Sequence, residues 1–164
     1  MTATYDSIAT TTLGSNANSV SFTSISGTYT DIVIVAQTKN SSTAANTRVT
    51  FNSDTGSNYS YTRLSGDGSS ATSGSAINAA FIGIDTQAAN DTTFNQVFIF
   101  QVSNYSNSTT YKTSLSRANN ASYGTNTTVG AWRSTNAITS VTFTPDGGQY
   151  ATGTTFTLYG IKAE

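Results

Sequence analysis

Short segments that alternate apolar and polar residues recur along the whole chain, separated by clusters of turn-forming residues. Val20–Ile25, Arg48–Asn52 and Tyr59–Leu64 each alternate over most of their length. A side-chain period of two belongs to a strand with one buried face, whereas an amphipathic helix repeats every 3.6 residues. No helical pattern of about 10–15 residues intervenes, so βαβ units are not expected. The pattern predicts an all-β fold.

About ten strands are expected, at the spacing of roughly 8–12 residues that is typical of sandwiches and barrels. Asp31–Gln37 is almost continuously apolar, as in a strand that is covered on both faces. Val97–Phe100 is the most hydrophobic stretch and is expected in the middle of a sheet. The other expected strands are Tyr5–Leu13, Ile77–Asp85, Phe94–Asn104, Tyr111–Arg117, Thr127–Arg133, Ile138–Thr144 and Thr154–Ile161. We therefore predict one antiparallel β-sandwich domain over residues 1–164, jelly-roll-like, with the strand order left open.

Three segments between the strands carry loop signals. Ser53–Asn58 has the residues of a tight turn, and Pro145–Gly148 is a turn of the Pro-Asp-Gly type. Ser65–Ser75 is rich in Gly and Ser and is expected to be a mobile loop.

Composition limits the chemistry that this chain can perform. It has no His and no Cys, and Ser, Thr and Asn fill 71 of its 164 positions. Acid–base, nucleophilic and metal chemistry draw mostly on His, Cys and clustered carboxylates. We therefore expect a protein that is not an enzyme, binds no metal or cofactor, and acts by contact with partners.

Charge and hydropathy exclude two further classes of partner. The net charge is −1 and the seven basic residues are scattered, so a nucleic-acid partner is not expected. No apolar run approaches the roughly 20 residues of a membrane span. Met1–Asp6 lacks the basic and apolar regions of a signal peptide, which predicts synthesis in a cytoplasm without export. A hydroxyl-rich surface made without export suits a virus particle, whose proteins fold in the host cytoplasm and leave by lysis.

Two groups of polar residues were weighed as chemical sites against a turn interpretation. Asp85 and Asp91 are the one carboxylate pair that could serve glycosidase chemistry, but both stand where turns favour Asp. Asn52, Asp54 and Asn58 could offer oxygens to Ca²⁺, but the segment lacks the Gly and Glu of an EF-hand loop. The turn interpretation is favoured for both.

Aromatic residues with polar neighbours are the strongest binding signal. Such rings can stack on sugars or anchor a protein interface, although strands also place them in the core. The candidate interaction residues are Tyr123 and Tyr150, in loop-like sequence, and Trp132. The other aromatic residues considered are Tyr59, Tyr61, Tyr105 and Tyr111.

Three segments, set apart along the chain from its start to its end, carry a family resemblance that covers most of the chain in order. They are Tyr5–Leu13, Arg48–Ser60 and Phe156–Lys162. In this order they resemble small structural proteins of tailed bacteriophages, notably marine and cyanobacterial phages. The resemblance implies a jelly-roll-like virion protein, carries no catalytic residues, and leaves the position on capsid or tail open.

Two functions remain as hypotheses. The first is a capsid decoration (cement) protein that binds the major capsid protein and copies of itself, with a trimer favoured, and stabilises the shell by mass action. The alternative is a tail-fibre or tail-tip module that recognises host surface glycan through Tyr123, Trp132 and Tyr150. A hydrolytic depolymerase built on Asp85 and Asp91 ranks lowest.

Overall fold

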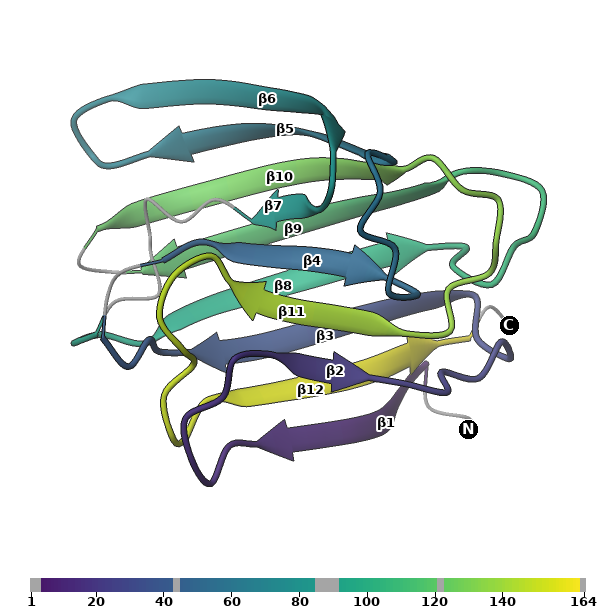
Figure 1. Cartoon of the computed structure of the whole chain (residues 1–164), viewed down its shortest axis with the longest axis horizontal. Coiled ribbons are helices and arrows are strands. Elements are labelled where there is room, and N and C mark those ends of the chain that lie inside the picture. Colours follow the sequence, from purple (N-terminus) through teal and green to yellow (C-terminus); the bar gives the residue numbers. More distant parts are fainter. Residues whose placement is uncertain (1–3, 43–44, 85–91, 121–122, 163–164) are drawn as a thin grey trace.

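Twelve strands and no helix make up the part of the chain that the computed structural model describes, residues 4–42, 45–84, 92–120 and 123–162 (Figure 1). The all-β prediction is confirmed, and the twelve strands slightly exceed the roughly ten expected. Nothing in the described residues is a helix able to cross a membrane. The strands are β1 (Tyr5–Thr12), β2 (Val20–Phe22), β3 (Asp31–Thr38), β4 (Thr47–Phe51), β5 (Tyr59–Gly66), β6 (Ala71–Ala79), β7 (Ile82–Ile84), β8 (Gln96–Ser103), β9 (Lys112–Asn120), β10 (Gly124–Trp132), β11 (Val141–Pro145) and β12 (Thr155–Ile161).

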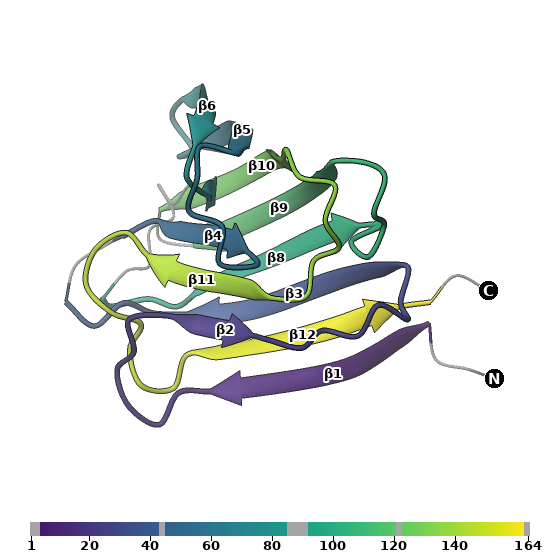
Figure 2. The same ribbon diagram turned by 45° about the vertical axis from the view of Figure 1, so that its right-hand side comes forward.

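The strands form two antiparallel sheets of unequal width that face each other (Figure 2). The large sheet has eight strands in the order β1-β12-β3-β8-β9-β10-β5-β6, and the small sheet has four in the order β2-β11-β4-β7. The two sheets pack through their inner faces, so the predicted β-sandwich is confirmed.

The strand order, which the sequence left open, is that of a jelly roll with two added hairpins. Without the hairpins β5–β6 and β9–β10, the remaining strands pair from the outside inwards: β1 with β12, β2 with β11, β3 with β8, and β4 with β7. Successive strands of this nested set alternate between the sheets, except for the innermost pair β4 and β7, which share the small sheet. This arrangement is the double Greek key of a jelly roll. Both added hairpins lengthen the large sheet at the same side.

The core lies where the two sheets overlap. Phe143 of the small sheet packs its ring against Phe98, Phe100 and Phe156 of the large sheet, at centroid distances of 5.7, 5.9 and 5.2 Å. Aromatic rings bury large apolar areas and favour tilted or edge-on pairs such as these. The expected central position of Val97–Phe100 is confirmed, because β8 lies between β3 and β9 in the large sheet. In β3, which contains Asp31–Gln37, both faces are buried or half-buried except at Gln37.

Two loop and strand predictions around residues 65–85 were wrong. Ser65–Ser75 is a hairpin and not a mobile loop, because β5 continues to Gly66 and β6 begins at Ala71. Backbone hydrogen bonds hold this ladder, so it needs none of the apolar residues that signal a strand. The predicted strand Ile77–Asp85 is split, since Ile77 belongs to β6 and Ile82 begins β7 in the other sheet.

Candidate functional site

The outward-facing surface of β8, β9, β10, β5 and β6 carries apolar side chains that no described element covers. Leu115 and Val129 stand directly opposite each other on β9 and β10 and are 50% and 54% exposed. Single exposed apolar residues are ordinary, but several on one sheet face indicate an interaction surface. We call this group the outer patch; its members are Leu64, Ile77, Val97, Ile99, Leu115 and Val129.

The opposite, inner face of β9 and β10 is polar. Ser114, Ser116 and Asn126 are buried there, and Asn126 Nδ2 donates to Ser65 Oγ at 2.9 Å. Thr128 Oγ1 in turn donates to Asn126 Oδ1 at 3.0 Å. Hydrogen bonding of this kind offsets the cost of burying polar groups. The inner face of these two strands is therefore mainly polar, while Leu115 and Val129 stand among polar residues on the outer face. We call this arrangement the inversion of β9 and β10.

A buried lysine completes the inversion of β9. Lys112 is 1% exposed, and its Nζ donates to the backbone carbonyls of Thr110 and Thr135 at 2.8 and 3.1 Å. Burial lowers the pKa of Lys112, because desolvation disfavours the ammonium form. The two carbonyl acceptors hold the charged end at the edge of the sandwich.

Shallow hollows lie between the side chains of the outer patch. One is bordered by Ile99, Leu115 and Arg117, and another by Ile77, Val129 and their neighbours on β5. Among the described residues that border these hollows and the one beside Gln101, Arg117 is the single charged residue. A surface with hollows and little charge is typical of the central part of a protein–protein interface.

A second feature lies between the tips of the two added hairpins. Tyr123, Asp67, Asn119 and Gly124 line an open cleft of about 420 Å³. A Cβ at Gly124 would collide with the backbone carbonyl of Gly66, so glycine permits the close approach of the tips. The ring of Tyr123 is 56% exposed. Of the predicted interaction residues, Tyr123 is the one that solvent reaches.

The Asp67 carboxylate in this cleft holds its own turn together. Asp67 Oδ1 accepts the backbone N–H groups of Ser70 and Ser69 at 2.7 and 2.8 Å. These two bonds and the serine hydroxyls lower the pKa of Asp67 well below its usual value. The cleft therefore carries a negative charge at neutral pH.

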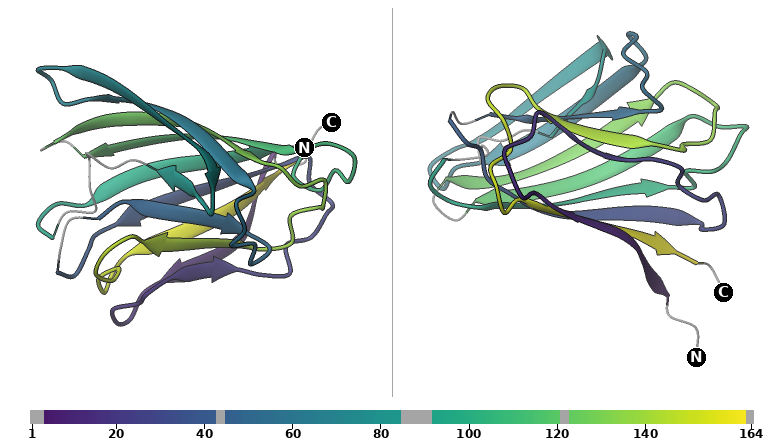
Figure 3. Two further views of the ribbon diagram at one scale, coloured as in Figure 1. Left: turned by 45° about the horizontal axis from the view of Figure 1, so that its top comes forward. Right: turned by 60° about the horizontal axis from the view of Figure 1, so that its bottom comes forward.

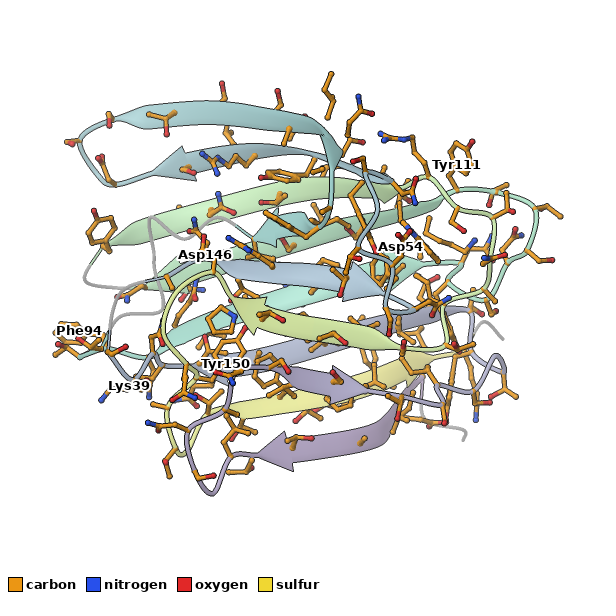
Figure 4. All side chains as sticks on the ribbon, in the orientation of Figure 1. Lys39, Asp54, Phe94, Tyr111, Asp146 and Tyr150 are labelled. Carbon is orange, nitrogen blue, oxygen red and sulfur yellow. The ribbon has the colours of Figure 1, made fainter. Side chains whose placement is uncertain are left out.

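The other two predicted interaction residues, Trp132 and Tyr150, are core residues. Tyr150 is fully buried, with its hydroxyl 3.2 Å from Thr47 Oγ1 and its ring against Phe156; Figure 4 shows it inside the sandwich, whereas Tyr111 lies at the periphery. Trp132 is 2% exposed. The segment around Tyr150 looks like a loop, but it bridges Ala17 and closes the end of the sandwich. Neither ring is available for stacking on a ligand from solvent.

The remaining aromatic candidates divide in the same way. Tyr59 and Tyr105 are fully buried, Tyr61 is half-buried, and Tyr111 is exposed. The outer patch was missed, because alternation identifies two faces of a strand without saying which is buried. The apolar residues Leu115 and Val129, set between polar neighbours, were the available signal.

Asn52, Asp54 and Asn58 form the turn that was favoured. Asp54 accepts hydrogen bonds from Gly56 N, Asn58 Nδ2 and Trp132 Nε1 at 2.8, 2.9 and 2.7 Å. Asn52 Oδ1 instead accepts from the backbone of Thr139 at 2.8 Å. Asp85 and Asp91 lie outside the described residues, in which no three acidic side chains gather to hold a metal.

Comparisons with protein-family models and with curated proteins found no match. The outer patch and the Tyr123 cleft therefore have to be interpreted from their own geometry and chemistry.

Proposed function

We propose that this chain is a structural protein of a tailed-phage virion that decorates the capsid shell and binds it through the outer patch. The observation that carries the proposal is the inversion of β9 and β10. Leu115 and Val129 face solvent while Ser114, Ser116 and Asn126 are buried behind them. Jelly rolls serve viral capsid proteins and lectins alike, so the fold is compatible with this role without deciding it.

The dimensions of the outer patch suit a protein partner. Five neighbouring strands carry it, and three of them, β6, β9 and β10, are nine residues long. With strands about 4.8 Å apart and a rise of about 3.3 Å per residue, the whole outer face of these five strands has an area on the order of 650 Å². A standard protein–protein interface buries about 800 Å² on each partner. Full burial of one Leu or Val side chain contributes about 1.5–3 kcal/mol, so a few contacts supply useful affinity.

The other end of the same sheet face is hydrophilic. On β1 and β12, Thr10 Oγ1 donates to Thr157 Oγ1 at 3.2 Å, and the hydroxyls of Thr12 and Thr155 are 3.3 Å apart. These hydroxyl pairs suit contact with water. The hydroxyl pairs therefore distinguish this end of the face from the outer patch, although the rings of Tyr5 and Tyr159 also pack together on it.

Shell binding by charge variants of the outer patch tests the proposal. The double variant Leu115→Lys/Val129→Lys should bind shells stripped of this protein at least tenfold more weakly than the parent. Its matched control, Thr10→Lys/Thr157→Lys, places the same charges at the hydroxyl pairs of β1 and β12 and should bind like the parent. Equal binding by both variants, or only a handful of copies in each purified virion, would contradict a decoration role.

The Tyr123 cleft favours a second candidate function, recognition of host surface glycan by a tail module. An exposed aromatic ring beside a carboxylate and an amide offers stacking and hydrogen bonds to a sugar. Here Tyr123→Ala should abolish binding to glycan arrays and slow adsorption to cells, while Trp132→Phe, a core change, should leave both as in the parent. Shell binding unchanged in Tyr123→Ala separates the two functions.

A further inference from the structure

Strand β6 is a long sheet edge without charged residues. It ends the large sheet, and Ala71–Ala79 contains no charged residue and no Pro. Natural proteins protect such edges with charges, Pro, bulges or short strands, because unpaired N–H and C=O groups invite another strand. The register of β6 shifts only near its base, where Ala79 and Ala76 pair with Tyr59 and Tyr61. The stretch 71–76 is regular and unprotected.

The other sheet edges are protected. The small sheet ends in β2 and β7, which are three residues long each. The second edge of the large sheet, β1, has a register shift between Ser7 and Ala9, and Asp6 forms an ion pair with Lys162 at 2.7 Å. The combination of length and absence of charge is therefore specific to β6 among the edges of the two described sheets, since β2 and β7 are also uncharged but short.

The hairpin that carries β6 is held in place at both ends. Asp67 organises its tip, as described above. At its base Arg133 Nη2 donates to Asn78 Oδ1 at 2.9 Å and to the carbonyl of Ser57 at 2.6 Å. An edge that is ordered before it binds loses less conformational entropy on association.

No described strand pairs with the free side of β6. The β5–β6 hairpin lies at the periphery of the molecule in every view, beyond the small sheet (Figures 2 and 3). None of the nine residues of β6 is buried, and its contact with the core is made by Ala79 at its end. Nine residues are therefore ordered with little burial and with a ladder on one side only.

We propose that β6 pairs antiparallel with β6 of a second copy across a two-fold axis and joins two large sheets into one. Antiparallel pairing of a strand with its own copy is symmetric, so one edge satisfies both partners. The residues that meet are Ser, Thr, Gly and Ala, which bring neither charge repulsion nor steric conflict. Pairing of β6 with β1 of the next copy is disfavoured by the bulge and charges of β1.

This pairing has a consequence for the outer patch. The local two-fold axis of an antiparallel strand pair is perpendicular to the sheet, so the outer faces of both copies lie on the same side. Ile77 and Leu64, the patch residues nearest the edge, then extend the apolar surface from one copy to the next. The pairing itself does not depend on the virion role.

Solution mass tests the proposal. The parent chain should sediment as a dimer, twice its 17.1 kDa mass. Ser73→Lys/Ser75→Lys, at exposed positions of β6, should be monomeric at concentrations where the parent is dimeric. The control Thr10→Lys/Thr12→Lys carries the same charges on the opposite edge and should remain dimeric. A monomeric or trimeric parent, or a dimer that survives the β6 charges, would overturn the proposal.

Hydrogen exchange can test the pairing on the unmodified chain. Because it needs no variant, misfolding of a variant cannot affect the result. Amides of 71–76 should become more protected as protein concentration rises, whereas amides of β1 should not change. Protection of β6 that is independent of concentration would also refute the pairing. The mass and exchange measurements use no capsid shells, so they can refute the strand pairing whether or not the protein binds shells. A failure of the pairing is therefore distinguishable from a failure of the proposed function.

Discussion

The indole Nε1 of Trp132, at the end of β10, donates a hydrogen bond of 2.7 Å to Oδ2 of Asp54 in the turn after β4. This bond joins the large sheet to a turn that leaves the small sheet. The ring of Trp132 stacks on Tyr59 at a centroid distance of 6.3 Å, and the hydroxyl of Tyr59 donates to the carbonyl of Asp54 at 3.0 Å. One carboxylate turn thus anchors two core rings.

Asp54→Ala should lower the free energy of unfolding by about 1–3 kcal/mol, because the buried indole N–H loses its acceptor. Fluorescence of Trp132, the single tryptophan, reports the transition in urea. Asp146→Ala is a control in another exposed turn, where Asp146 Oδ1 accepts from Asn46 N; it should cost less, because no core ring depends on it. Equal losses would show that the Trp132 bond is unimportant.

Alkaline pH should destabilise the protein through Tyr59. Burial is the main reason that the pKa of Tyr59 is raised to about 12 from its usual 10.0. Because this pKa is raised in the folded state, the protonated Tyr59 hydroxyl contributes fully to the free energy of unfolding below pH 10.0. That contribution is lost as the pH approaches about 12. Urea midpoints of the parent should therefore fall over this range. Tyr59→Phe should show a shallower fall, and an identical slope would contradict the assignment.

Gly160→Ala should destabilise the large sheet. Gly160 lies on β12, and a Cβ there would collide with the ring of Tyr29. Forcing an extra methyl group into a packed site costs about 1–3 kcal/mol. Gly14→Ala, where a Cβ would meet nothing within 4 Å, is the matched control and should melt like the parent. Recovery of stability in Gly160→Ala/Tyr29→Ala would confirm that the ring is the obstacle.

Asp67→Ala should loosen the tip of the β5–β6 hairpin without unfolding the sandwich. The amides of Ser69 and Ser70 lose their acceptor and should exchange faster with solvent, while those of β3 and β8 keep their protection. Acid should act in the same way. Because the pKa of Asp67 is depressed in the folded state, the carboxylate stabilises the tip fully above pH 3.8, and this stabilisation is lost as the pH falls further. Unchanged exchange at Ser69 would show that the carboxylate does not organise the tip.

Strands whose apolar residues are also the residues that the fold buries could be predicted from the sequence. β3 and β8 are recognisable because Ile32, Ile34, Phe98 and Phe100 are all buried and β-forming. The predicted turn at Ser53–Asn58 was also correct, since Asp54 bonds to residues two and four positions further on. Such local chemistry needs no knowledge of distant parts of the chain.

Features that depend on the partner sheet were mispredicted. Tyr150 was placed on the surface because its neighbours are polar, yet bridges to Ala17 and Asn40 close the chain around it. The hairpin at Ser65–Ser75 was interpreted as a loop because its ladder uses backbone groups alone. In the same way, the exposure of Leu115 follows from its place on the outer face of β9, because the small sheet packs against the inner face of the large sheet.

The sequence by itself determined that the chain forms short strands with tight turns, because side-chain alternation and turn chemistry act over a few residues. Tertiary structure alone decided which face of each strand is buried and which sheet edge stays unpaired. Those outcomes depend on strands far apart in the chain, such as the pairing of β1 with β12, and no local pattern contains that information.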